Sequence, residues 1–83
     1  TTVTEGFVPV TVVRSGAIHV GDRVVDISGA AAEVANALGR ANLDRVVVIP
    51  DREVPTGVTL AVMDACAAGG AKHVDLAASR EAP

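Results

Sequence analysis

The feature that most constrains the fold is a strand–helix–strand pattern in the second half of the chain. Residues 46–49 are a continuous run of β-branched side chains, which is typical of a strand buried within a sheet. Pro50 is expected to end this strand, and Pro55 has the fixed φ that suits the first turn of a helix. The helix is predicted to end at Gly69-Gly70, before a last strand at 73–78. Because such a crossover joins parallel neighbours, part of the sheet should be parallel.

A small antiparallel meander is predicted near the start of the chain. Apolar segments at 8–13, 17–20 and 23–25 are separated by two-residue turn signals, Ser15-Gly16 and Gly21-Asp22. Side chains alternate between the two faces of a strand, so each short strand should bury one set and expose the other. The expected sets are Ile18, Val20 and Val25 on one face, and His19 and Val24 on the other.

The first helix is expected between this meander and the buried strand. Ser28 is predicted to be its N-cap, because a serine hydroxyl accepts hydrogen bonds from free backbone amides. Apolar residues then recur at helical spacing, with charged residues between them. The side chains expected to face the sheet are Ala31, Val34, Leu38 and Ala41, and those expected in solvent are Glu33, Asn36 and Arg40. For the second helix the expected buried set is Val58, Ala61, Val62 and Ala65, flanked by Leu60 and Met63.

These elements follow the order ββ(β)αβαβ, with no internal repeat. We predict an α+β fold, a two-layer sandwich in which two helices pack on one face of a mixed sheet of about five strands. Eighty-three residues are enough for one domain only. The expected organisation is a linker at 1–7, the domain at 8–79 and a frayed tail at 80–83. Since the chain lacks an initiator Met, we expect it to be a piece of a longer protein.

Composition argues against several classes of function. The net charge is −3 and Phe7 is the only aromatic residue, whereas single-strand binders use a basic groove and stacked rings. We therefore expect no nucleic-acid partner. Cys66 is the only cysteine, so no internal disulfide can form, and it is expected to be a small buried side chain. No apolar stretch approaches the ~20 residues that a membrane-spanning helix needs.

Charged residues near the end of the buried strand are the first candidates for catalysis. Asp51 follows that strand directly, and catalytic groups of α/β folds often lie at such carboxyl ends. Arg52, Glu53 and Asp64 are nearby in sequence, but no nucleophile or base accompanies them. Asp51 is therefore expected to cap backbone amides or to pair with Arg52, and Asp64 to face solvent or an interface.

No metal or cofactor site is expected either. Cys66 lies within an alanine-rich helix rather than at the electropositive helix start that stabilises a thiolate. His19 and His73 are remote in sequence, and one cysteine without a paired histidine motif is not a zinc ligand set. The chain has no glycine-rich phosphate loop. The residue that comes nearest to an anion site is Gly57, at the expected start of the second helix. We expect the protein not to be an enzyme.

The ordered set of motifs resembles the periplasmic, C-terminal domain of the ExbD/TolR family of biopolymer transport proteins. In that family an apolar strand is followed by Asp-x-x-Val, a helix with Val-Met-Asp, a glycine and a further apolar strand. The matching residues here are Asp51, Val54, Val62-Met63-Asp64, Gly70, Val74 and Leu76. Segments 15–18 and 21–24 look like the early hairpins of the family, and the resemblance spans 10–77.

The resemblance implies a non-catalytic role in energy transduction. Family members are single-pass proteins of the Gram-negative inner membrane whose periplasmic domain forms homodimers. Their one transmembrane helix, which is not in this sequence, carries the proton-bearing Asp and assembles with a pentameric ExbB/TolQ-type channel. The implied function is to couple the proton-motive force to protein and transmembrane transport by docking to a TonB/TolA-like partner. TolR-like members also contact peptidoglycan, and many members carry an aromatic residue where Thr56 stands here.

Three surfaces are expected to make these contacts: the first strand, the open face of the sheet and the loop before the second helix. The candidate residues are Val8, Val10, Val12, Asp51, Val54, Pro55, Gly57 and Asp64. Unpaired strand edges, expected along the first strand and the early hairpin, favour dimerisation or strand addition by a peptide. The alternative function is a free-standing α/β domain that senses a small anion at the Gly57 helix start.

Overall fold

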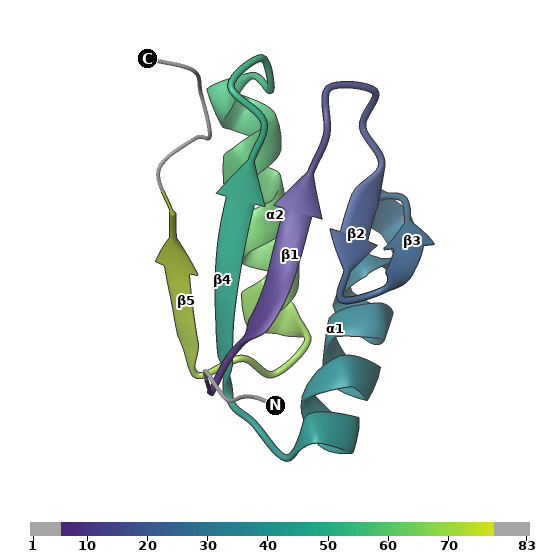
Figure 1. The fold of residues 1–83 in the computed structure, drawn as a ribbon, viewed down its shortest axis with the longest axis vertical. Helices are drawn as coiled ribbons and strands as arrows, with labels where there is room; N and C mark the ends of the chain where they lie inside the picture. The colour runs from purple at the N-terminus through teal and green to yellow at the C-terminus, as the bar shows by residue number, and fades with distance from the viewer. Residues whose placement is uncertain (1–5, 78–83) are drawn as a thin grey trace.

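The computed structural model describes residues 6–77, which form five strands and two helices (Figure 1). In chain order these are β1 (Val8–Val12), β2 (Ile18–Val20), β3 (Arg23–Val25), α1 (Ile27–Ala41), β4 (Arg45–Pro50), α2 (Thr56–Ala68) and β5 (His73–Leu76). The predicted order and the α+β class with a mixed five-stranded sheet are confirmed. The expected tail lies outside the described residues, as does the expected linker apart from Gly6 and Phe7.

β1 lies in the middle of the sheet, whose strand order is β3-β2-β1-β4-β5. It pairs antiparallel with β2 and parallel with β4, and β4 in turn pairs parallel with β5. The expectation that the first strand has an unpaired edge is therefore wrong. The reason is that the crossover through α1 returns the chain beside β1, which leaves β3 and β5 as the edges within the described residues.

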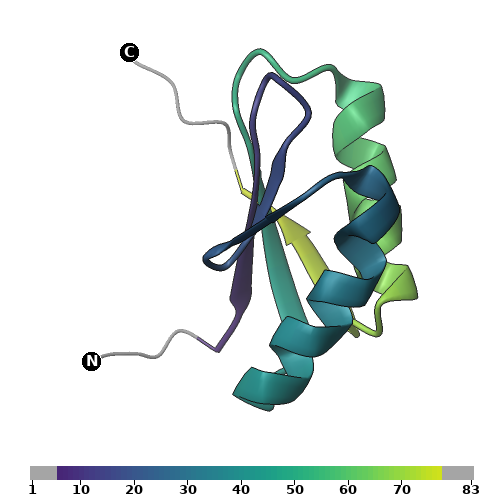
Figure 2. The ribbon, with the colours of Figure 1, turned by 90° about the vertical axis from the view of Figure 1, so that its right-hand side faces the viewer.

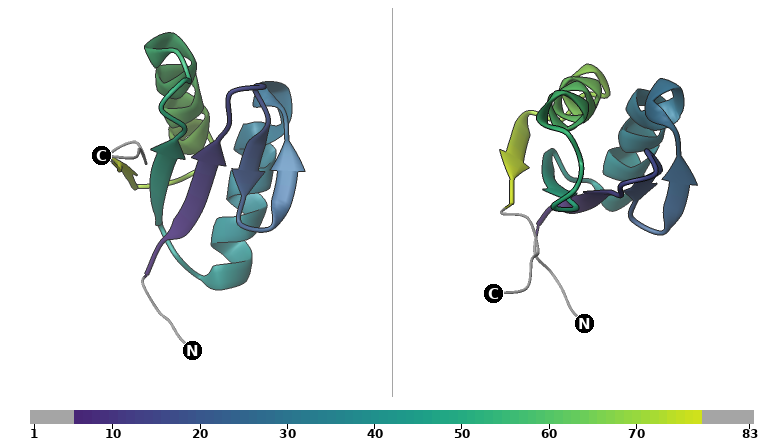
Figure 3. Two further views of the ribbon diagram at one scale, coloured as in Figure 1. Left: turned by 45° about the horizontal axis from the view of Figure 1, so that its top comes forward. Right: turned by 90° about the horizontal axis from the view of Figure 1, so that it is seen from above.

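Both helices pack on one face of the sheet, and no other described element covers the opposite face, which we call the open face (Figure 2, Figure 3). The covered face buries every second residue of the central strands, as a period of two predicts. The buried strand residues are Val8, Val10, Val12, Ile18, Val20, Val46 and Val48, and the buried apolar helix residues are Ala30, Val34, Ala37, Leu38, Val62 and Cys66. Val8, Val10 and Val12 were candidate contact residues, but they form the core and no partner reaches them without opening the fold.

Asp26, and not Ser28, caps the N-terminus of α1. Its Oδ1 atom accepts hydrogen bonds from the backbone N–H of Gly29 (3.1 Å) and from the Ser28 hydroxyl (2.8 Å). These two donors, the hydroxyl first, lower the pKa of the Asp26 carboxyl. At the other end, Asn42 adopts the left-handed conformation (φ 57°) that closes the helix.

The buried face of α1 differs from the predicted one. Val34 and Leu38 are buried as expected, whereas Ala41 is exposed. Glu33, expected in solvent, is only 8% exposed, which corrects the prediction. Because alanine is compatible with either side of a helix, the alanine-rich pattern left the rotation of α1 undetermined and the tertiary packing decided it.

α2 buries Thr59, Val62 and Cys66 against the sheet. Val58 and Ala61 are exposed, so the expected buried stripe is right only at Val62 and, in part, at half-buried Ala65. Nearly every residue of α2 is apolar or small, and such a helix has no polar face to mark its outer side. Cys66 is a small buried side chain as predicted, and burial raises the pKa of its thiol to about 11.

Candidate functional site

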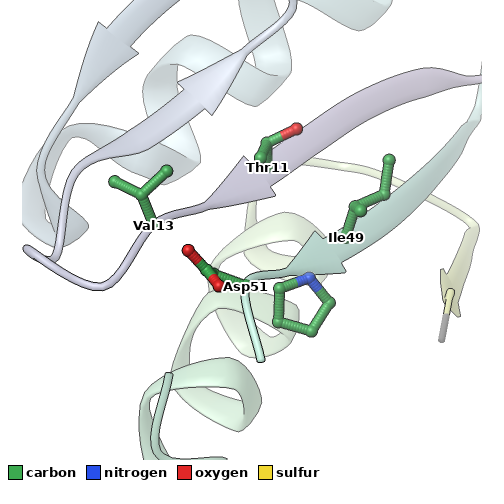
Figure 4. Close-up of a pocket in the computed structure, with 5 residues that line it drawn as sticks. Thr11, Val13, Ile49 and Asp51 are labelled. Atoms are coloured by element: carbon green, nitrogen blue, oxygen red, sulfur yellow. The ribbon is translucent and has the colours of Figure 1, made fainter. Parts of the chain in front are cut away.

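A shallow depression lies on the open face of the sheet, where β1 and β4 end. Its volume is about 340 Å³, and it is lined by Thr11, Val13, Ile49, Pro50 and Asp51 (Figure 4). Thr11 and Ile49 are register partners on the two parallel strands, so their side chains lie next to each other on the same face. The period of two puts Val13 on that face as well.

Backbone hydrogen bonds fix Asp51 at the rim of this depression. β4 continues through Pro50, one residue beyond the predicted end, and Pro50 is the register partner of Val12. The N–H of Asp51 then donates to the Val12 carbonyl at 2.8 Å. The Asp51 carbonyl accepts from the Val54 N–H at 3.0 Å, which turns the chain toward α2. The expectation that Pro50 ends the strand fails because an N–H at position 50 would face away from β1, so the proline removes no hydrogen bond to β1 and the Asp51 N–H continues that ladder.

Asp51 supplies the negative charge of the depression. Arg14 and Glu53, in the two loops beside it, form an ion pair in which Arg14 Nη1 lies 2.5 Å from Glu53 Oε1. Among the described residues the Asp51 carboxylate enters no ion pair, so the expected pairing with Arg52 is absent there. Thr11 adds a hydroxyl, and the remaining lining side chains are apolar. Both polar side chains can accept hydrogen bonds.

The structure brings together only part of the expected contact set. Asp51, Val54, Pro55 and Gly57 follow one another in the β4–α2 loop and the first turn of α2, with Val54 partly buried against the core. Asp64 is exposed on α2, in the helix layer. Thr11, Val13 and Ile49 were not singled out from the sequence. The alternation of side chains along a strand places these three residues on the open face. It identifies them as a site only once β1 and β4 are known to be neighbours.

The N-terminus of α2 has no side-chain cap among the described residues. Pro55 occupies the N-cap position without a side-chain hydrogen bond, and Gly57 is exposed with open space around it. Within residues 6–77, no three His, Cys, Asp or Glu side chains gather closely enough to hold a metal ion. Over the same residues, neither helix is both long and apolar enough to cross a membrane.

A second depression of about 370 Å³ lies at the opposite end of β1. It is bounded by the β2–β3 turn, the last turn of α1 and the start of β1. Its lining residues are Phe7, Val8, Pro9, Val20, Gly21, Asp22, Ala37, Arg40, Ala41 and Leu43. Arg40 and Asp22 give it one charge of each sign, so it favours neither a cation nor an anion.

The two strands at the ends of the sheet offer unpaired backbone. Among residues 6–77, β3 pairs only with β2, and β5 pairs only with β4. Leu76, on β5, is 54% exposed. On the open face, Arg45 of β4 forms an ion pair with Asp75 of β5, with 2.6 Å between Arg45 Nη1 and Asp75 Oδ2. Such edges are the parts of a sheet that accept another strand.

No protein-family model matches the chain, and no curated protein matches it.

Proposed function

We propose that this domain is the periplasmic part of an inner-membrane complex of the ExbB–ExbD or TolQ–TolR type, which couples the proton-motive force to transport. In this proposal the domain is not an enzyme. It forms a homodimer and docks to a TonB/TolA-like partner, and its transmembrane helix, outside this sequence, joins an ExbB/TolQ-like channel subunit. The resemblance in motif order supports the proposal, as does an α+β fold with two accessible strand edges.

The observation that carries the dimer is the direction of the backbone groups on β5. The His73 N–H donates to the Asp44 carbonyl (3.1 Å) and the Ala77 N–H donates to the Val48 carbonyl (2.9 Å), both on the β4 side. Successive N–H groups of a strand point to opposite edges, so those of Val74 and Leu76 point away from β4. Val74 therefore presents both its N–H and its carbonyl to a further strand.

A two-fold axis beside Val74 would pair two β5 strands antiparallel and join two sheets into one. In that register the Val74 backbones exchange two hydrogen bonds, and His73 of each copy faces Asp75 of the other. Arg45, the register neighbour of His73, is paired with Asp75 of its own copy, so the imidazole of His73 is the group that faces Asp75 of the second copy. An imidazole N–H can donate to a carboxylate, and cross-strand polar pairs contribute about 0.2–1 kcal/mol each. The edge is thus self-complementary in its backbone and in the side chains that face each other.

The test is sedimentation velocity over a range of protein concentrations. The unmodified domain should dimerise, and His73→Asp should raise the dimer dissociation constant by about tenfold, because two pairs then become repulsive at about 0.5–1 kcal/mol each. His19→Asp is the matched control, since His19 is a histidine of the same open face on β2. A domain that remains monomeric at millimolar concentration, or equal effects of the two substitutions, would contradict the proposed dimer.

Docking to a TonB/TolA-like partner, and in the TolR-like case to peptidoglycan, is assigned to the open face and the β4–α2 loop. These surfaces remain accessible when two β5 edges pair, because pairing extends the sheet in its own plane. Titration of the isotope-labelled domain with a periplasmic fragment of the partner should shift the amide resonances of residues 11–13 and 49–57. Shifts confined to the helix layer would place the docking surface elsewhere and overturn this assignment.

A further inference from the structure

The depression at the end of β1 and β4 has a distinct chemistry. Among the described residues that line it, Val13, Ile49 and Pro50 form apolar walls, Thr11 and Asp51 are polar, and the Asp51 carboxylate alone is charged. Figure 4 shows Thr11, Val13 and Ile49 projecting from the same side of the strands, with Asp51 at the end of β4. A matching ligand group has an apolar body and a terminal hydrogen-bond donor that carries positive charge.

Among the described residues, no basic side chain pairs with the Asp51 carboxylate, so it can bind such a group. The nearest basic residue on the β1–β2 loop, Arg14, is paired with Glu53. Arg52 follows Asp51 in the chain and is exposed, but it does not line the depression. The Asp51 backbone N–H is bonded to Val12, so the sheet ladder holds the main chain that carries this side chain at the rim.

A lysine side chain matches this site better than a compact cation. Its four methylene groups can lie along apolar surface while the ammonium group reaches a carboxylate at the rim. The depression is open and lies beside the end of two strands, where an extended peptide can pass. An ammonium ion without a stem would leave the apolar walls unused.

We propose that this depression is a subsite for one lysine side chain of an extended peptide partner, with the ammonium on Asp51 and the stem between Val13 and Ile49. The inference rests on the proposed docking function and adds to it the chemistry of the partner segment. It concerns the open face, whereas the dimer uses the β5 edge, so the two can fail separately.

The experiment is an NMR titration of the labelled domain with the capped pentapeptide Ac-Ser-Val-Lys-Val-Ser-NH₂. Binding should shift the amide resonances of Thr11, Val13 and Ile49, and it should weaken at high salt because the ion pair is exposed to solvent. The same peptide with norleucine in place of lysine keeps the stem and loses the charge. It should bind at least about threefold more weakly, the order expected for one exposed ion pair.

The matched variants are Asp51→Asn and Asp44→Asn, which change the net charge by the same amount. Asp44 is exposed in the α1–β4 loop, at the opposite end of β4. Asp51→Asn should lower affinity for the lysine peptide at least about threefold and leave affinity for the norleucine peptide unchanged, whereas Asp44→Asn should change neither. Equal binding of the two peptides, or equal effects of the two variants, would overturn the lysine subsite. If Asp51→Asn still dimerises in that case, only the lysine subsite is contradicted and the proposed function is not.

Discussion

Gly69 lies directly against the backbone of Ala31, where the end of α2 meets the start of α1. A Cβ atom built at position 69 would lie 2.5 Å from the Ala31 carbonyl oxygen and 3.3 Å from Val34 Cβ. The first contact is with backbone, which cannot rotate away as a side chain can. The two helices can therefore approach this closely only because residue 69 has no side chain.

Gly69→Ala should destabilise the domain by about 1–3 kcal/mol, the usual cost of inserting an atom into a packed interface. Gly39→Ala is the control, because Gly39 is an exposed residue within α1 and nothing lies within 4 Å of a Cβ built there. That substitution should stabilise by about 0.5–1 kcal/mol through the better helix propensity of alanine. Urea unfolding followed by circular dichroism measures both. Destabilisation by both substitutions alike would show that the helix contact is not the cause.

The Glu33 carboxylate is buried with few interactions that offset its loss of hydration. Its Oε2 atom accepts no hydrogen bond in the described structure, and its ion-pair partner Arg40 lies 3.7 Å away with a side chain that is 60% exposed. Replacing a poorly compensated buried charge by an apolar side chain of similar size is often neutral or stabilising. Glu33→Leu should therefore raise the free energy of unfolding by about 1 kcal/mol.

Arg40→Ala tests the same pair from the other side. It removes the cation that pairs with the buried Glu33 carboxylate, so it should destabilise the parent domain by about 1 kcal/mol. In the Glu33→Leu background it should have almost no effect, because no carboxylate remains. Chemical denaturation of the four proteins gives this cycle. A loss of stability in Glu33→Leu itself would mean that the Glu33 side chain is favourable where it lies.

The cap of α1 should make stability depend on pH at the acid end. The pKa of Asp26 is lowered in the folded state, so its contribution is present above the unfolded-state pKa of about 4 and is lost as the pH falls through the lower folded value. Asp26→Asn keeps a side chain that can cap but removes this titration. The difference in melting temperature between parent and Asp26→Asn should shrink from pH 6 to pH 2. A constant difference over that range would show that the cap has no ionic component.

Cys66 should be unreactive in the native protein. Burial raises the pKa of its thiol from 9.0 to about 11, which lowers the thiolate fraction at pH 8 by about 100-fold. Iodoacetamide should therefore label the folded domain at least about 100-fold more slowly than the domain in 6 M guanidinium chloride, followed by intact mass. Labelling at comparable rates in the two solutions would show that the thiol is accessible in the folded state.

The parts of the fold that follow from the sequence are those that local chemistry decides. The run of valines at 46–48, the prolines of the β4–α2 loop and Gly69-Gly70 each favour one local structure, and the strand–helix–strand order emerges from them. The N-cap of α1 was predicted two residues late because Ser28 and Asp26 both suit that position. Their hydrogen bond shows that they act together, with the carboxylate as the cap.

The candidate site could not be predicted in the same way because it depends on which strands are neighbours. Val8, Val10 and Val12 were expected at a surface because the first strand was expected at an edge, and its pairing with β4 placed them in the core. The same pairing brought Thr11 beside Ile49 and made the depression next to Asp51. Local patterns do not specify a parallel pairing between strands more than thirty residues apart, which is settled by burial of the whole sheet.

The most direct test of the proposed function is the coding sequence upstream of Thr1. We predict one apolar helix of about 20 residues that contains a single Asp, joined to this domain by a short polar linker. That result would place the domain outside the inner membrane, next to a proton-carrying helix. A start codon immediately before Thr1, or a second globular domain there, would contradict the membrane-anchored transducer and leave only the free-standing domain.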